Sequence, residues 1–435
     1  MSIRARKLLA VHPTLVLLAA PLLAADGEPT FYRDVLPLLQ ENCQTCHRPS
    51  GDDLFGMVAP MSFLTYEETR PWARAIAKQT GSRAMPPWHA SPAFDGVFVN
   101  ERTLAEDEIA VFAAWAAAGA PAGAPADAPE PVAWLGTDGW SIGKPDLVLT
   151  FDEPFLVEDA VRDHYENISI RLGEDVLPED RYIKAMQFKP DSDAVHHIVM
   201  FANRPGDAPI AAEDAEGGGL PANMLGGFGP GTDATVFPPG YGRLLRAGSI
   251  LTFNMHYHKE PGPGTAVWDR SEIAFTFWDE PVRHNVAWNG ARSFDFEIPA
   301  NHPNWVVGAS AVFSSDVTLM ALFPHMHLRG SAATYWVTYP DGERAMILDV
   351  PKYDFDWQTN YIFREPLRLP AGSRLDVQLV YDNSPENAAR AGFDPNRAVH
   401  WGGPTTDEMA VGFYDYTLTD PAPPEEIPSS SASGR

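Results

Sequence analysis

A stretch rich in Ala, Pro and Gly, from residue 117 to 132, separates two parts of the sequence that differ in hydrophobic periodicity. Before it, apolar residues recur at helical spacing, as at Phe31, Val35 and Leu39. After Trp140 they fall into short alternating runs, such as the one at 336–338, divided by Pro, Gly, Asn and Asp, which is typical of β-strands. Because the stretch can bury little apolar surface, we expect a semi-rigid linker at residues 119–144.

The chain has 435 residues, more than one hydrophobic core usually serves, so we expect a multidomain protein. The pattern predicts a small all-α domain at 26–118, with a helix near 66–79 and a last helix that begins with a capping box of Thr103 and Glu106. Two tandem all-β sandwich domains, jelly-roll-like, are expected at 145–285 and 286–420. A weak internal repeat supports the tandem, since Ala-Gly-Ser precedes a predicted strand at both 247–249 and 371–373.

Residues 1–25 have the pattern of a signal peptide: a basic start, an apolar run from Leu15 to Leu23, and small residues before Asp26. We therefore expect an exported protein of bacterial type, periplasmic or secreted. A membrane-spanning helix needs about 20 apolar residues, and no run reaches that length, so no membrane span is expected. The net charge of −26 disfavours nucleic acid as a partner. The Pro- and Ser-rich tail at 421–435 is predicted to be disordered.

The only two cysteines of the chain lie in a Cys43-Gln44-Thr45-Cys46-His47 motif. This spacing predicts covalent attachment of haem c through Cys43 and Cys46, with His47 as an axial ligand of the iron. A zinc site would need a second pair of ligands nearby. For the sixth ligand we favour Met85, because the prolines that follow it would stiffen a loop across the haem; Met57 and Met61 are alternatives. Residues 30–120 resemble the class I c-type cytochromes, a family that transfers single electrons.

The β region contains three histidine clusters: His196-His197, His256-Tyr257-His258 and His325-Met326-His327. Residues i and i+2 of a strand share a face, so His325 and His327 can point at one ion, and so can His256 and His258. Adjacent histidines at 196 and 197 point in opposite directions in a regular strand. Their joint ligation of a metal requires a bulge, a strand end or different ring nitrogens.

Imidazole-rich sites suit copper or zinc, and a thioether ligand shifts the preference to copper because soft sulfur favours Cu(I). The candidate thioether is Met409, which follows a Gly-Gly and an Asp-Glu stretch. The sequence has no H-E-x-x-H motif of the zinc peptidases.

From about Asp146 to Leu418 the chain resembles the type II copper monooxygenases, the family of peptidylglycine alpha-hydroxylating and dopamine beta-monooxygenases. The resemblance implies that His196, His197 and His256 hold one copper ion, with His258 as an extra histidine that could replace or support His256. It implies that His325, His327 and Met409 hold a second, catalytic copper, and that the two ions face a solvent-filled cleft between the sandwiches. The order of these residues along the chain agrees with the family.

The chain departs from the amidating members of that family at the substrate anchor. Where those enzymes have an Arg, an Asn and a Tyr that hold a peptide carboxylate, this sequence has Phe323, Val411 and Phe413. A carboxylate would lack its charged partner, so we expect a different and less polar substrate.

Together these patterns predict an oxidoreductase that hydroxylates a C–H bond of a small organic substrate with dioxygen. Electrons would come from ascorbate or a periplasmic donor through the fused haem at high effective concentration. One alternative is a non-catalytic periplasmic copper–haem protein that transfers electrons or handles copper; another is a structural β module with surface histidines. His89, His164, His284 and His302 are expected to be packing or surface residues, and His400 to support the Met409 loop.

Overall fold

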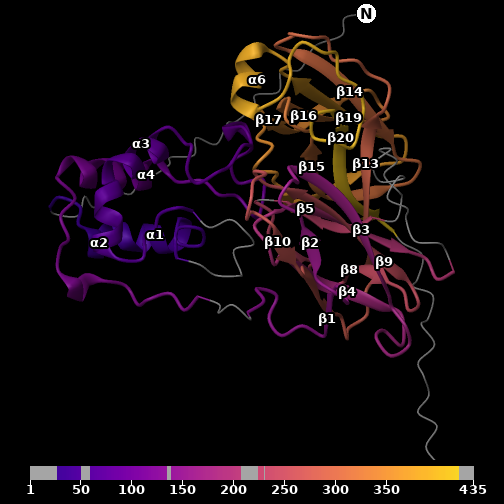
Figure 1. Ribbon diagram of the computed structural model, residues 1–435, viewed down its shortest axis with the longest axis horizontal. Helices are drawn as coiled ribbons and strands as arrows, with labels where there is room; N and C mark the ends of the chain where they lie inside the picture. The colour runs from indigo at the N-terminus through magenta and orange to yellow at the C-terminus, as the bar shows by residue number, and fades with distance from the viewer. Residues whose placement is uncertain (1–26, 50–58, 135–138, 207–223, 230, 421–435) are drawn as a thin grey trace, which may run out of the picture.

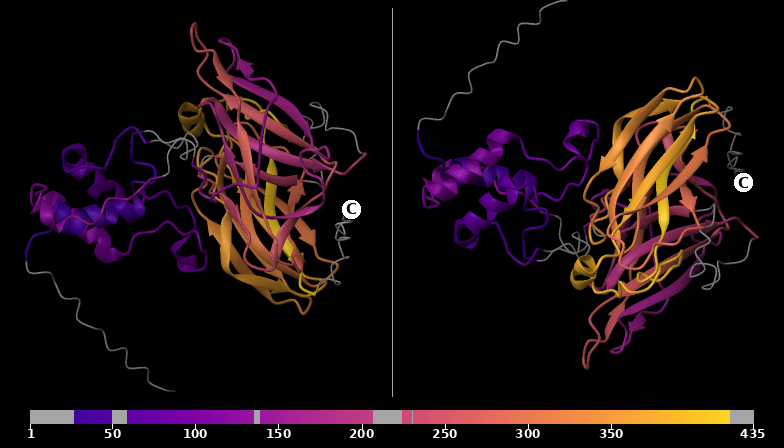
Figure 2. Two further views of the ribbon diagram at one scale, coloured as in Figure 1. Left: turned by 90° about the horizontal axis from the view of Figure 1, so that it is seen from below. Right: turned by 90° about the horizontal axis from the view of Figure 1, so that it is seen from above.

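The computed structural model describes residues 27–49, 59–134, 139–206, 224–229 and 231–420. The predicted signal peptide, the predicted disordered tail and Met57 lie outside this part of the chain. The described part is mostly β-sheet with a few short helices, as the sequence predicts in outline (Figure 1). All the helices except α6 (Pro385–Ala391) gather at the N-terminal end of the chain, beside the two β units (Figure 2).

The helical unit is built from short elements around a small aromatic core. Phe31, Leu39, Phe112 and Trp115 are fully buried there, and α3 packs against α4. Its elements are η1 (Phe31–Val35), α1 (Leu36–Asn42), α2 (Tyr66–Thr69), η3 (Arg70–Trp72), α3 (Ala73–Gly81), η4 (Pro92–Phe94), α4 (Glu106–Ala117) and η5 (Pro125–Asp127).

The capping box predicted at Thr103 is wrong. The side chain of Leu104 is buried in the core, and the chain stays non-helical until α4 begins at Glu106. The Thr103 hydroxyl donates to Glu101, 2.7 Å away, while Glu108 is the carboxylate that accepts from the helix N-cap, at the backbone N–H of Ala105.

A capping box that the sequence reasoning missed begins α2. The Thr65 hydroxyl accepts a hydrogen bond from the backbone N–H of Glu68, and the Glu68 carboxylate accepts one from the backbone N–H of Thr65.

The beginning of the predicted linker packs against the helical unit. The carbonyls of Pro121 and Ala122 accept hydrogen bonds from the backbone N–H groups of Phe31 and Tyr32, and Ala120 is buried. These hydrogen bonds satisfy the first N–H groups of η1, which have no partner inside the helix. The stretch from 120 to 122 therefore belongs to the helical unit.

The first β unit consists of two main sheets around one core. The four-stranded sheet has the order β3-β9-β5-β6, and a six-stranded sheet contains β1-β11-β4-β8-β12 with β7 paired to β4. Residues such as Ile198, Phe253 and Phe275 fill the space between them because alternate residues of each strand face inward. Its strands are β1 (Leu147–Thr150), β2 (Phe155–Val157), β3 (Asp163–Arg171), β4 (Arg181–Lys189), β5 (Val195–Asn203), β6 (Met224–Phe228), β7 (Thr235–Val236), β8 (Tyr241–Leu245), β9 (Ile250–His258), β10 (Val267–Asp269), β11 (Glu272–Phe277) and β12 (His284–Asn285).

The second β unit is a continuous eight-stranded sheet in the order β17-β16-β19-β14-β13-β20-β15-β18. The pairing of β13 with β14 consists of a single residue pair, Arg292 with Ser310. Residues from both ends of the sheet order, such as Leu348 and Tyr361, share one core, so the sheet folds over on itself. Its elements are β13 (Ala287–Ser293), β14 (Trp305–Val312), β15 (Val317–His325), β16 (Gly330–Thr338), β17 (Arg344–Val350), β18 (Tyr361–Leu369), β19 (Arg374–Tyr381), α6 (Pro385–Ala391) and β20 (Ala410–Leu418).

A segment of the predicted α domain is built into the core of the second β unit. Phe98 is fully buried there, in ring contact with Tyr361 and Phe363, and it forms a β-bridge with Phe363. An ion pair of 2.7 Å between Arg102 and Asp233 adds a contact to the first β unit. The helical unit is therefore tied to both β units.

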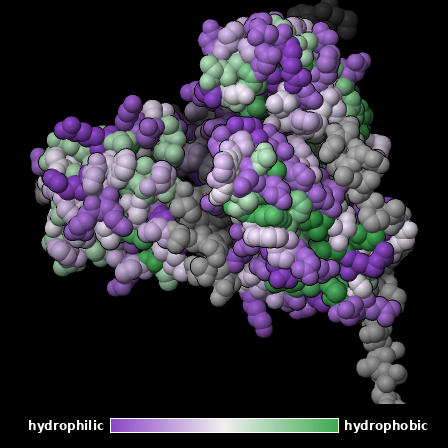
Figure 3. Space-filling model, viewed as in Figure 1, coloured by the Kyte–Doolittle hydropathy of each residue, from purple (hydrophilic) through white to green (hydrophobic). Residues whose placement is uncertain are grey.

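No helix in the described part of the chain is long and apolar enough to cross a membrane. On the face shown in Figure 3, most of the surface is hydrophilic, and the larger hydrophobic areas lie on the β region.

Candidate metal centre

A bulge at the start of β5 brings two adjacent histidines to the same side of the sheet. β5 pairs with β9, and the register shifts between Val195 and His197, so that His197 lies opposite His256 while His196 is the extra residue. A bulge is one of the three arrangements that would allow neighbouring histidines to bind one ion. Three imidazoles from two strands therefore meet at one point.

The three imidazoles present the same ring nitrogen to that point. The Nδ1 atom of His197 lies 3.3 Å from Nδ1 of His196 and 3.3 Å from Nδ1 of His256. A tetrahedral ion with metal–nitrogen bonds of about 2.0–2.1 Å holds two ligand nitrogens roughly 3.3 Å apart. These spacings thus match the edges of a coordination tetrahedron, and among the described residues this trio forms a group able to hold a metal ion.

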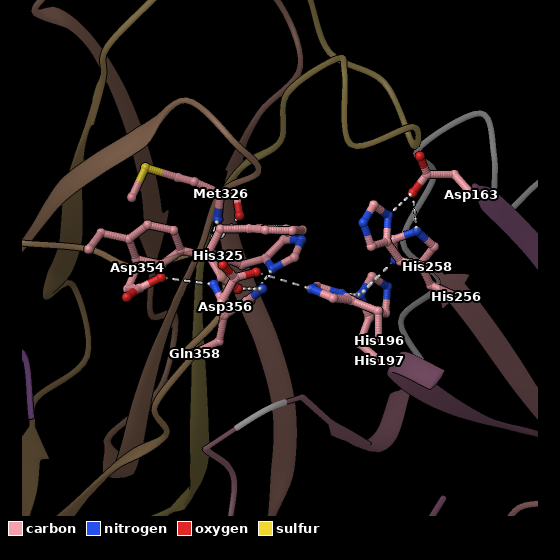
Figure 4. A network of polar contacts seen from close by, with 12 residues as sticks. Asp163, His196, His197, His256, His258, His325, Met326, Asp354, Asp356 and Gln358 are labelled. Carbon is pink, nitrogen blue, oxygen red and sulfur yellow. Dashed lines mark hydrogen bonds and ion pairs between the residues drawn. The ribbon is translucent and has the colours of Figure 1, made fainter. Parts of the chain in front are cut away.

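The other ring nitrogen of His256 is held by a carboxylate. Asp163 at the start of β3 lies 3.0 Å from Nε2 of His256 and 2.9 Å from Nδ1 of His258, as Figure 4 shows. A hydrogen bond from Nε2–H to this carboxylate leaves the Nδ1 lone pair free to bind metal. His258 is 44% exposed and uses its Nδ1 on Asp163, so it supports the trio from outside, whereas His256 belongs to it.

Burial keeps the inner imidazoles neutral. It lowers the pKa of His197 well below the ordinary value, with further lowering by the neighbouring histidines, and it lowers the pKa of His256 to about 4 despite the opposing hydrogen bond to Asp163. Burial raises the pKa of Asp163, but the hydrogen bonds to His256 and His258 outweigh it and the pKa falls below the usual range. Neutral imidazole is the form that binds metal.

The second histidine pair lies at the end of β15 in the second β unit. Nδ1 of His325 is 2.8 Å from the side-chain oxygen of Gln358, and Nδ1 of His327 is 3.2 Å from the carbonyl of Asp407. Because each Nδ1–H has an acceptor, Nε2 is the nitrogen that carries the lone pair in both rings. Burial lowers the pKa of His325 to about 4 and holds the pKa of His327 well below its ordinary value, so both are neutral.

The structure brings Met409 to this pair. β15 and β20 run antiparallel with His325 opposite Val411, and continuing that register by two residues sets Met409 opposite His327. Met409 is 8% exposed and lines one cavity with both histidines. Met326, by contrast, is fully buried in the core of the second β unit.

The residue before Met409 fixes the loop that carries His327. The buried carboxylate of Glu408 accepts hydrogen bonds from the backbone N–H groups of His327, at 2.8 Å, and Arg329, at 2.7 Å. Burial raises the pKa of Glu408 to about 8, and these hydrogen bonds oppose the rise. The carboxylate thereby joins the end of β15 to the start of β20.

The two histidine groups lie close together. The ring centroids of His197 and His325 are 6.4 Å apart, and the cavity that both line has a volume of about 120 Å³. The resemblance to copper monooxygenases implied an open, solvent-filled cleft here. The space is small because aromatic side chains of both β units, among them Trp288 and Phe413, pack into it.

A larger cleft, of about 1120 Å³, lies on the other side of the trio. His196, His258 and Asp163 line it together with Met85 and Pro86 of the helical unit. The ring of Phe355 stacks on His196 at 4.6 Å between centroids and also lies 6.2 Å from His327. His196 therefore faces the cleft that the helical unit borders, while His197 faces the small cavity.

The cysteine motif lies just after α1. Both Cys43 and Cys46 are free thiols, and the backbone N–H of His47 donates to the carbonyl of Cys43 at 2.9 Å. Nδ1 of His47 lies 3.3 Å from the carbonyl of Met61, which leaves Nε2 as the nitrogen for a metal bond. Because Met61 is held on the Nδ1 side of the ring, it is a poor candidate for the ligand opposite His47. Met85 stays the preferred candidate and is 42% exposed.

The isolated histidines belong to neither group. His164 contacts Glu166, His284 stacks on Tyr241, and His302 lies against Trp305. His400 supports the Met409 loop through its backbone, since its carbonyl accepts from the N–H of Glu408. His89 is half-buried and lines the larger cleft.

Several residues that orient the histidines were not foreseen from the sequence. They are Asp163, Gln358, Phe355 and Glu408. Of these four residues, only Glu408 could have been found from the sequence, because it directly precedes Met409. Asp163 is 93 residues from His256 and Gln358 is 33 residues from His325, so no local pattern links them to their partners.

No family model and no curated protein matches the chain. Among solved structures, it is similar to the major capsid protein P2 of bacteriophage PM2, with 7% identity and a TM-score of 0.25 over 62% of this chain and 96% of that chain. It is also similar to the VP2 subviral particle of infectious bursal disease virus, with 9% identity and a TM-score of 0.20 over 66% of this chain and 76% of that chain. Similarities with such TM-scores carry no inference about this chain.

Proposed function

We propose that this chain is a copper-dependent monooxygenase that hydroxylates a C–H bond of a small organic substrate with dioxygen. Each of the two histidine groups would hold one copper ion. The first group consists of His196, His197 and His256, and the second consists of His325, His327 and Met409. The net reaction is R–H + O₂ + 2 electrons + 2 protons → R–OH + H₂O, and a one-electron donor supplies the electrons.

One observation carries the proposal: imidazoles from two β units converge in two adjacent groups, one of which shares its cavity with a thioether. The set of three imidazole nitrogens has the spacing of metal ligands. The Met409 sulfur on the other group favours copper over zinc. Bound copper would supply dioxygen activation and one-electron transfer. The protein supplies the fixed ring orientations, through Asp163, Gln358 and the carbonyl of Asp407.

We further propose that the helical unit is a class I cytochrome c with haem attached to Cys43 and Cys46. The free thiols and the hydrogen-bonded Nδ1 of His47 fit this role. Met85 and His196 line the same cleft, so the electron-carrying group would lie next to the three-histidine group. This arrangement suits an electron supply from the helical unit, replacing or supplementing ascorbate.

The test is a comparison of copper content and dioxygen consumption in the full-length protein and in the variants His325→Ala and Met409→Ala. His302→Ala, which alters an imidazole outside both groups, is the matched control. We expect two copper ions per chain in the parent and in the control, loss of one in His325→Ala, and loss of dioxygen consumption in both site variants. Full copper content and full activity in both variants would overturn the assignment.

A second measurement addresses the electron supply and the non-catalytic alternative. Haem absorbance is followed by stopped flow after the reduced protein is mixed with dioxygen, with and without bound copper. We expect reoxidation to be faster with copper. Equal rates would contradict the supply route, and copper binding without substrate-dependent dioxygen consumption would favour an electron-transfer or copper-handling protein.

A further inference from the structure

The cavity between the two β units has a predominantly apolar lining next to both histidine groups. His197, His325 and His327 border it, and the same cavity touches the side chains of Phe201, Met224, Trp288, Phe323 and Phe413. These aromatic and thioether side chains form a cluster of their own that joins β5 and β6 of the first unit to β13, β15 and β20 of the second. The lining is thus mostly apolar, although polar side chains such as Asn254 and Asn360 also belong to it.

Each of the charged Asp and Arg side chains of the described cavity lining has an ion-pair partner. Arg243 contacts Asp415 at 2.6 Å, and it also donates to the carbonyls of Val286 and Leu225. Asp233, the other charged residue of the lining, forms its ion pair with Arg102 outside the cavity. A charged ligand would therefore lose its water without gaining an unpaired counter-ion in the described lining, which is unfavourable.

The volume of the cavity limits the size of what it can hold. An apolar cavity of about 150 Å³ in another protein stays dry and binds benzene. The present cavity of about 120 Å³ is slightly smaller than that. A single six-membered ring is the largest group that this volume can enclose, and a short polar substituent on it would contact polar side chains of the lining such as Gln358 or Thr232.

We infer that this cavity is the substrate site and that the substrate is a small, uncharged molecule with a single aromatic ring. The inference rests on the proposed function and narrows it. It places the ring against Trp288 and Phe413, whose own centroids are 5.0 Å apart, and its reacting carbon toward Met409 and His327. The resulting hydroxylation has the stoichiometry given above, with the same one-electron donor.

The experiment measures binding by calorimetry, so that it needs no turnover. The probes are benzyl alcohol, benzoate and benzylamine, which share one ring and differ in charge, and they are titrated into the full-length protein with and without copper. We expect benzyl alcohol to bind at least tenfold more tightly than either ion. Equal or tighter binding of benzoate or benzylamine would overturn the inference.

Two cavity variants and one control variant locate the binding in the cavity. Val199→Phe adds an aromatic ring at the cavity lining, and we expect it to abolish binding of benzyl alcohol. Val306→Phe makes the same change on the exposed side of β14, where Val306 is 51% exposed, and should leave binding unchanged. Trp288→Ala enlarges the cavity and should admit 2-naphthol, which the parent excludes. Unaltered binding in both cavity variants would show that the probe binds elsewhere.

The outcomes for the inference and for the proposed function are distinguishable. A protein that binds copper and consumes dioxygen but does not bind benzyl alcohol refutes only the substrate class. A protein that binds benzyl alcohol but takes up no copper refutes the monooxygenase and leaves a binding site for neutral aromatic molecules.

Discussion

At the scale of single residues, one carboxylate determines the role of two histidines. Asp163 accepts from Nε2 of His256 and contacts Nδ1 of His258, so the two imidazoles on β9 are not equivalent. The ring of His256 is fully buried, and its Nδ1 atom faces the other two imidazoles of the trio. The Nδ1 atom of His258 instead contacts the carboxylate of Asp163. The sequence alone left the choice between these two histidines open, and the hydrogen bonds favour His256 as the member of the trio.

The variants His256→Ala and His258→Ala separate the two roles. His256→Ala removes one of three ligand nitrogens and should eliminate tight copper binding at the trio. His258→Ala removes only a neighbour of Asp163, and we expect an affinity loss of roughly 10-fold, at the low end for partners that orient metal ligands. Competition with a chromophoric copper chelator measures both, and a stronger loss in His258→Ala than in His256→Ala would reverse the assignment.

At the scale of elements, periodicity predicted the character of each part of the chain. Alternating apolar runs correctly indicated strands. The two-residue period required a bulge, a strand end or different ring nitrogens if His196 and His197 were to bind one ion, and the structure has the bulge. Contacts between distant segments had no such signal. Phe98 lies in a stretch without clear periodicity, and its partner Phe363 is far away in the sequence, so its place in the core of the second β unit was not predictable.

The packing of Phe98 in the core of the second β unit can be tested by mutation. Phe98→Ala leaves a cavity among Trp88, Tyr361 and Phe363, and we expect it to destabilise the second β unit by about 3–5 kcal/mol. Val99→Ala changes the next residue, which is 54% exposed, and should have little effect. Urea unfolding followed by tryptophan fluorescence measures both. Equal midpoints would mean that the segment is not part of that core.

At the scale of the whole molecule, the site depends on how the two β units pack together. Each unit contributes one histidine group, and the rings of His197 and His325 approach to 6.4 Å only because the units are in contact. The hydroxyl of Tyr165 in the first unit donates to the carbonyl of Gly403 in the second, at 3.0 Å. No periodicity within either unit encodes this arrangement, which is why the sequence indicated the candidate histidines but not the small cavity between the two units.

An ion pair across the interface between the two β units allows a test of how far the site depends on their packing. Arg243 on β8 of the first unit is buried and binds Asp415 on β20 of the second, and burial raises the pKa of Asp415 while the guanidinium opposes the rise. Asp415→Asn leaves the guanidinium without a counter-ion, and removal of one partner of a buried pair costs about 3–5 kcal/mol. We therefore expect a lower urea midpoint and a loss of benzyl alcohol binding.

Two further variants distinguish the interface from a general charge effect. Asp279→Asn breaks the pair with Arg181 on the surface of the first unit, where Asp279 is 93% exposed, and it should leave the midpoint unchanged. The double variant Arg243→Met with Asp415→Leu replaces both charges by apolar groups and should recover most of the stability, because no unpaired charge stays buried. If Asp415→Asn alone were as stable as the parent, the pair would not hold the units together, and the closeness of the two histidine groups would need another cause.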